Sequence, residues 1–152
     1  MQESELTAIS NKFTQGLEKL KRLEKCLEFL AGEMEFRLES HQIDPVRGEL
    51  AFTFAGMRFY IRIRVTDRDV DDVGTEYRVP IGWLDWGRFD ENDQREAPIQ
   101  SNFYDDRGIL CELEKDEFYC DFQSCSDDRV RRGIVLHLRS LVGRSIALNN
   151  TI

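Results

Sequence analysis

The sequence lacks any uninterrupted apolar run of the roughly 20 residues that a membrane-spanning helix requires, because charged residues interrupt every hydrophobic stretch. The first residues also lack the basic and then apolar pattern of a signal peptide. Glu3, Glu5 and Lys12 fall inside the window that would have to be apolar. We therefore expect a cytoplasmic protein that does not interact with a membrane.

Cysteine and histidine are scarce, with four and two residues in the chain of 152. The cysteines are too few and too unevenly spaced for a small disulfide scaffold. Zinc sites usually show two tight ligand pairs, whereas Cys120 and Cys125 form one loose pair, with Cys111 and His137 elsewhere in the chain. We therefore expect buried thiols, no disulfide, no metal and no cofactor.

The motifs that carry catalysis or phosphate binding are absent as well. The chain has no G-x-S-x-G elbow, no G-x-x-x-x-G-K-[ST] loop and no G-x-G-x-x-G turn. The two histidines, His41 and His137, have no sequence context that marks either as a general base. The sequence therefore indicates no catalytic residue, which favours a protein that is not an enzyme.

Negative charge is present in excess, and it is concentrated in one part of the chain. The formal charge is −8, yet residues 67–128 carry 19 acids against 6 bases, while residues 129–152 carry five bases and no acid. Two interpretations are open. The basic end folds back onto the acidic segment and neutralises it, or the acidic surface faces outward to meet a partner with a basic surface.

The densest acidic run contains Asp67, Asp69, Asp71 and Asp72. It does not fit a calcium-binding EF-hand loop, since the sixth position is Asp72 instead of glycine and the twelfth is Arg78 instead of glutamate. A solvated loop is the simpler interpretation, and these four carboxylates are our candidates for contact with a basic partner.

Residues 3–38 are predicted to form one long amphipathic helix, without any proline to interrupt it. Every residue in one heptad position is apolar: Leu6, Phe13, Leu20, Leu27 and Met34. The second heptad series fails at Gly16 and Arg37, so packing within the chain and pairing with a second copy both remain open. Because such a helix exceeds the width of a domain of this size, we expect a homodimer through it.

After His41 the apolar period changes from helical to alternating, which predicts antiparallel strands. One predicted strand carries Arg58, Tyr60, Arg62 and Arg64 on the face opposite its apolar side chains. These four residues are the candidates for an anionic ligand or a nucleic-acid backbone, although pairing with acids of neighbouring strands is favoured. Pro80 places the next strand at an edge or bulge, and residues 85–98 are predicted to be a polar loop.

The last element is predicted to be a helix from about Asp127 to Ala147, capped by Ser124 or Ser126. Together these elements predict a single α+β domain over residues 1–152. We expect a long N-terminal helix (1–40), a meander-like antiparallel sheet of about five or six strands (41–123), and a C-terminal helix with its tail (124–152), the helices packed on one face of the sheet.

The tryptophans give the best pointer to a contact surface. Trp83 and Trp86 precede the predicted charged loop, and a surface tryptophan next to charged residues is typical of a protein contact, although core placement of both is equally open.

The first functional hypothesis is an acidic, non-enzymatic protein-binding module. It would be an inhibitor, an immunity-type antidote or an export-chaperone-like binder, or would imitate nucleic acid. A ligand-binding or enzymatic pocket between sheet and helix, using Tyr60, Arg62, Arg64 or His137 on an anionic ligand, is the second hypothesis. Nucleic-acid binding through the arginine strand is the third, disfavoured by the net charge.

Overall fold

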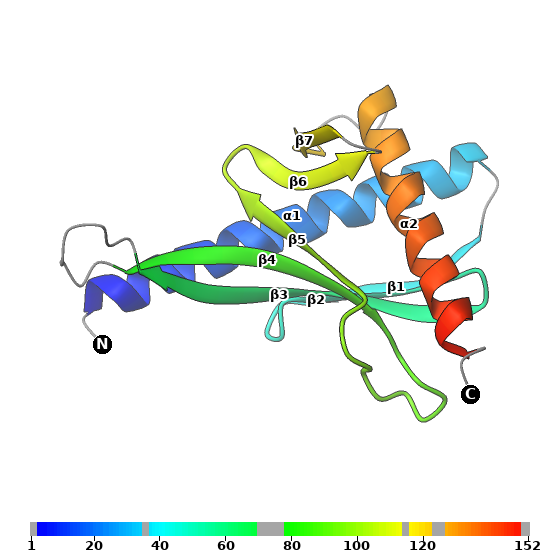
Figure 1. Ribbon diagram of the computed structural model, residues 1–152, viewed down its shortest axis with the longest axis horizontal. Helices are drawn as coiled ribbons and strands as arrows, with labels where there is room; N and C mark the ends of the chain where they lie inside the picture. The colour runs from blue at the N-terminus through cyan, green and yellow to red at the C-terminus, as the bar shows by residue number, and fades with distance from the viewer. Residues whose placement is uncertain (1–2, 35–36, 70–77, 114–115, 123–126, 150–152) are drawn as a thin grey trace.

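The computed structural model describes residues 3–34, 37–69, 78–113, 116–122 and 127–149 (Figure 1). A long helix, α1 (Glu3–Met34), opens the chain, and a second helix, α2 (Asp128–Asn149), closes it. Between them run β1 (Leu38–Asp44), β2 (Glu49–Phe54), β3 (Met57–Asp69), β4 (Arg78–Arg88), β5 (Gln100–Asp105), β6 (Gly108–Leu113) and β7 (Asp116–Cys120). The predicted α+β architecture is confirmed.

The sheet is an antiparallel meander in which each strand pairs with the next one along the chain, in the order β1 to β7. It contains seven strands, where five or six were expected. The additional strand is β1, whose sequence LESHQID lacks an apolar alternation and whose side chains are all at least partly exposed. The predicted helix therefore ends earlier than expected, at Met34.

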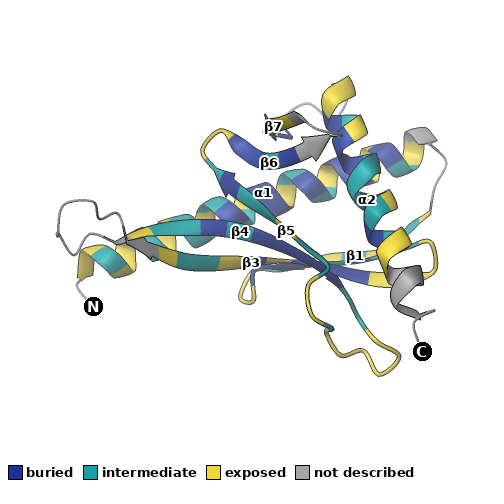
Figure 2. Cartoon of the chain, in the orientation of Figure 1, coloured by how far each residue is buried: buried dark blue, intermediate teal, exposed yellow. Residues whose placement is uncertain are grey.

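Both helices cover the same face of the sheet, which we call the covered face. Strand pairing places Ile61 opposite Trp86 and Ile63 opposite Leu84, so these side chains share that face. Its core is mainly apolar, and the buried residues follow the inner sides of α1, β3 and β4 (Figure 2). Within the described part of the chain, the other side of β2–β5 has no helix over it, and we call it the open face.

The predicted heptad residues of α1 pack largely within the chain. Leu20 and Leu27 are fully buried in the core, and Phe13 packs partly buried against it. Leu6 is 55% exposed, and the Met34 side chain lies outside the described part of the structure. The long β3–β4 hairpin runs beside α1 toward the N-terminal end of the helix (Figure 1). The hairpin therefore accommodates the length of α1, from which pairing with a second copy was expected.

The structure corrects the predicted loop at residues 85–98. Strand β4 continues to Arg88, and the loop begins after it. Asp85 is buried within the strand because Arg64 of β3 and Ser101 of β5 both donate hydrogen bonds to its carboxylate, at 2.7 and 2.6 Å for the shortest contacts. A charge that suggested a loop is thus paired across strands.

Pro80 lies inside β4, opposite Asp67 of β3. Strand β5 pairs only with Gly82–Trp86, so among the described strands this part of β4 has a neighbour on one side. The proline therefore occupies a local edge, as the missing N–H requires.

Helix α2 begins and ends within two residues of the prediction. Its cap is Asp127, whose carboxylate accepts the N–H of Arg129 at 2.8 Å, whereas the predicted caps Ser124 and Ser126 lie outside the described residues. Neither helix has a stretch apolar enough to cross a membrane within the residues described.

Candidate binding site

Strand β5 has a free edge. It pairs with β4 along Gln100–Tyr104, but with β6 only at Tyr104 and Asp105. Beyond that hairpin the two strands diverge, so in the described structure Gln100–Phe103 has a strand on one side only. Because backbone N–H and C=O groups point to alternate sides of a strand, every second residue of this stretch directs its polar groups away from β4.

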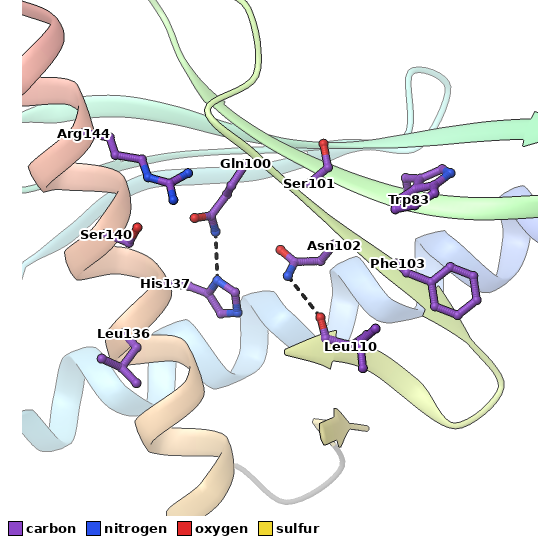
Figure 3. Close-up of a pocket in the computed structure, with 10 residues that line it drawn as sticks. All are labelled: Trp83, Gln100, Ser101, Asn102, Phe103, Leu110, Leu136, His137, Ser140 and Arg144. Atoms are coloured by element: carbon purple, nitrogen blue, oxygen red, sulfur yellow. Dashed lines mark hydrogen bonds between the residues drawn. The ribbon is translucent and has the colours of Figure 1, made fainter. Parts of the chain in front are cut away.

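A cavity of about 760 Å³ lies along this edge, between β5, β6 and the side of α2 (Figure 3). Its volume falls within the usual range for ligand sites. The cavity is lined by β4 and β5 side chains of the open face, by β5 side chains of the covered face, by β6 and by α2. The lining residues are Trp83, Gln100, Ser101, Asn102, Phe103, Leu110, Leu136, His137, Ser140 and Arg144.

His137 forms the centre of the helical wall. Its ring stacks on Trp86 at 5.2 Å between centroids and 14° between planes, and its Nδ1 lies 2.8 Å from the side-chain amide of Gln100. Burial lowers the pKa of His137 to about 4, so the imidazole is neutral at pH 7. The amide N–H of Gln100 then donates to Nδ1, and Nε2 carries the proton. Among the described residues Nε2 has no hydrogen-bond partner.

Asn102 and Arg144 supply further polar groups. The Asn102 amide donates to the carbonyl of Leu110 at 3.1 Å, while its buried Oδ1 accepts no hydrogen bond from any described residue (Figure 3). Arg144 donates through Nη1 to the carbonyl of Ile99 at 2.8 Å and is otherwise exposed. Among the described lining residues it is the only charged one. Because buried acceptors are normally satisfied, the Asn102 oxygen marks a place where a bound donor would be stabilised.

The open-face wall is aromatic. Trp83 and Phe103 meet edge to face with centroids 5.9 Å apart, and the Arg64 guanidinium lies 5.3 Å over the Trp83 ring. Trp83 Nε1 donates to Thr66 Oγ1 at 3.0 Å, which fixes the indole. Strong hydrogen bonds to Asp85 raise the pKa of Arg64, so its charge is permanent. Aromatic and arginine side chains held in this way are the types that contribute most at protein interfaces.

The predicted arginine strand lies on the open face as expected, but outside the cavity. Arg58 pairs with Asp93 at 3.3 Å, and Tyr60 is buried with its hydroxyl donating to the carbonyl of Glu96 at 2.6 Å. Arg64 pairs with Asp85, a neighbouring strand's acid, as the sequence favoured. Arg62 is exposed and has no ion-pair partner in the part of the chain described. The pocket of the second hypothesis therefore contains His137 but neither Tyr60, Arg62 nor Arg64.

The two tryptophans have different places. Trp83 is half-buried on the open face, and Trp86 is 1% exposed in the core, where it offers no surface to a partner. Of the four predicted acidic contact residues, Asp67 is exposed. The structure describes only the backbone of Asp69, and Asp71 and Asp72 lie outside the described residues.

Sequence reasoning missed Gln100, Asn102, Ser140 and Arg144. They belong to no spaced motif, and they meet only because β5 and β6 diverge below α2. One sequence feature could have indicated the site: Arg144 lies on a helix that was expected to pack on the sheet.

The described cysteines do not contribute to this site. Cys26, Cys111 and Cys120 are buried, and the Cys26 thiol lies 3.6 Å from the carbonyl of Phe122. Burial raises the pKa of Cys111 to about 12 and that of Cys120 to about 11, so both stay protonated at neutral pH. They are core side chains by chemistry as well as by position.

Comparison of the chain with protein-family models, with curated proteins and with solved structures gave no match.

Proposed function

We propose that the protein is a binding module that holds an extended segment of another protein against the free edge of β5. The observation that carries this proposal is the Gln100–Phe103 stretch, which has a strand on one side and a cavity of about 760 Å³ on the other. An added strand would satisfy the outward N–H and C=O groups of β5, which is how many proteins bind peptides. Four residues of strand span about 13 Å.

The walls of the cavity favour a particular segment. Alternate side chains of an added strand would face the Trp83–Phe103 pair on one side and Leu136 and His137 on the other. Arg144 is the only charge among the lining residues that the structure describes, and none of these is an acid. A carboxylate near that end of the segment would therefore be attracted. We therefore expect an extended segment with an apolar residue and a carboxylate.

This geometry favours some of the binding roles that were considered from the sequence over others. An export-chaperone-like binder or an inhibitor can use an open strand edge to hold a partner's chain. A nucleic-acid mimic needs carboxylates along one exposed face, whereas the described open face carries Arg58, Arg62 and Arg64. The acidic segment 67–128 adds attraction for a basic surface elsewhere on the partner.

A library of displayed seven-residue peptides tests the proposal. We expect peptides enriched on the wild-type protein to lose at least tenfold in affinity on Ser140→Trp, which fills the cavity. They should retain it on Arg139→Trp, an exposed position on the same helix outside the lining. Thermal unfolding of both variants confirms folding, and bound peptide should slow amide hydrogen exchange at residues 100–103. Failure to enrich any peptide, or equal loss on both variants, would overturn the proposal.

A small anionic ligand in the same cavity is the second candidate. It is favoured by the neutral His137, with a free Nε2–H in the described structure, and by Arg144 in the same lining. A thermal-shift screen of small carboxylates and phosphates would give a concentration-dependent rise in melting temperature that Arg144→Ala removes. No rise with any compound eliminates this candidate.

Self-association through α1 is limited by the burial of its apolar residues. Leu20 and Leu27 are fully enclosed, so a homodimer through this helix would have to use its exposed apolar side chains, Leu6 and Phe29. Light scattering on the wild type, on Leu6→Lys and on Phe29→Lys separates a dimer through either position from a monomer.

A further inference from the structure

Three potential metal ligands meet where the C-terminal half of α1 passes β1. Glu24 and Glu28 are four residues apart, so they lie one above the other on the same side of α1. His41 comes from β1, with Nδ1 3.3 Å from Glu24 Oε2 and Nε2 3.3 Å from Glu28 Oε1. One ligand atom from each of the three residues falls within 4.8 Å of the others.

A break in strand pairing gives His41 this position. Glu39 pairs with Thr53 and Gln42 with Ala51, so Ser40 and His41 together oppose a single residue of β2. Ser40 adopts a left-handed φ of 51°. A bulge of this kind redirects side chains, and bulges are common beside functional sites. Here it accompanies an imidazole placed between two carboxylates of the neighbouring helix.

The three residues offer a cation the donor atoms that it needs. A metal ion binds an imidazole through one nitrogen lone pair, and Glu24 and Glu28 would each add one carboxylate oxygen. Two carboxylates on the same side of the helix also attract a positive ion to this position.

The ligand types and spacing suit a divalent transition metal. Zinc binds imidazole nitrogen and carboxylate oxygen at about 2.0–2.2 Å, which places pairs of its ligand atoms about 3–4 Å apart. Each separation of 3.3 Å falls in that range, but the two involve different ring nitrogens. An ion bound to one ring nitrogen would therefore have one carboxylate at that distance and the second within the 4.8 Å that the three ligand atoms span. The side chains of His41, Glu24 and Glu28 are 29%, 25% and 50% exposed, so an ion can reach them and water can complete its coordination.

We propose that Glu24, Glu28 and His41 form a binding site for a divalent transition-metal ion of the zinc type. The spacing E-x₃-E-x₁₂-H matches no standard zinc pattern, so the expectation of no metal site followed from the sequence. The site joins α1 to β1, and the proposal is independent of the function proposed for the β5 edge.

Titration of the metal-free protein with Zn²⁺ by calorimetry tests the site. We expect one ion per chain, with affinity at least tenfold weaker in His41→Ala and in Glu28→Gln. Glu18→Gln, an exposed carboxylate on the same helix outside the cluster, is the matched control and should bind as the wild type does. Thermal unfolding without metal verifies that each variant is folded.

Cobalt distinguishes this site from the cysteines. Co²⁺ bound by nitrogen and oxygen ligands gives visible absorption without the near-ultraviolet charge-transfer band of a thiolate ligand. We expect the former spectrum, lost in His41→Ala. A thiolate band, an absence of binding at millimolar metal, or unchanged affinity in both His41→Ala and Glu28→Gln would overturn the proposal.

Discussion

The two faces of the sheet are built from different chemistry although they share the same strands. The covered face is apolar and closed by the leucines of α1, four of which are fully buried. The open face is held by local pairs of charge and aromatic groups, such as Arg64 with Asp85 and Trp83 with Phe103. Stability therefore depends mainly on the covered face, and the open face retains side chains that can contact a partner.

The largest expected difference between the faces is the cost of deleting a side chain. Leu27→Ala should lower the free energy of unfolding by about 2–5 kcal/mol, because it leaves a cavity in a closely packed core. Phe103→Ala, which removes a half-buried ring from the open face, should cost clearly less. Urea unfolding of both variants measures the two values. Equal losses would show that the open face carries as much of the stability as the core does.

The same difference explains which elements could be predicted. The apolar alternation of Phe59, Ile61 and Ile63 records burial under a helix, so β3 and its exposed arginines were correctly predicted. Local sequence failed for β1 and for the end of β4. Asp85 is acceptable inside a strand only because Arg64 and Ser101 come from neighbouring strands, and such tertiary compensation has no local signal.

The candidate site was less predictable than the fold. His137 was considered for a pocket between sheet and helix, and it does line one. The free edge of β5 depends on where β6 leaves it, which is set by the long-range packing of α2 and β7 on β6. No spacing in the sequence encodes that divergence.

The next effect concerns His137, at the border between the covered face and the cavity. Its pKa is about 4 when folded, because burial disfavours the charged ring, against 6.5 for an ordinary histidine. The unfolded chain therefore binds the proton first, and stability is lost as pH falls from about 6.5 toward 4. The loss from this group is at most about 3 kcal/mol.

Denaturant titrations at several pH values check this expectation. His137→Phe keeps an aromatic ring on Trp86 but cannot titrate, so its stability should fall less between pH 7 and pH 4 than that of the wild type. The difference between the two curves isolates this residue from the carboxylates that titrate in the same range. Parallel curves would mean that the ring is accessible to water when the protein is folded.

The smallest expected difference in stability is between two glycine-to-alanine variants, one on each face, where a tyrosine ring covers the glycine. A Cβ at Gly82 would lie 2.2 Å from the Tyr104 ring on the covered face, and a Cβ at Gly87 would lie 2.4 Å from the Tyr60 ring on the open face. Alanine at either position therefore forces the ring to move, at a typical cost of about 1–3 kcal/mol. The two substitutions are chemically identical, so any difference between them reports how firmly each ring is held.

We expect Gly82→Ala to cost more than Gly87→Ala. The Tyr104 hydroxyl donates to the carbonyl of Lys12 at 2.7 Å, inside helix α1, so the ring cannot shift without disturbing the helix. The Tyr60 hydroxyl donates to the carbonyl of Glu96, in the loop that follows β4. Arg88 holds this residue by accepting its N–H and pairing with its carboxylate, which is less restraint than the continuous hydrogen bonding of a helix. Thermal unfolding of the two variants gives the order directly. The reverse order would show that the loop holds Tyr60 as firmly as α1 holds Tyr104, and that the open face is as rigid as the core.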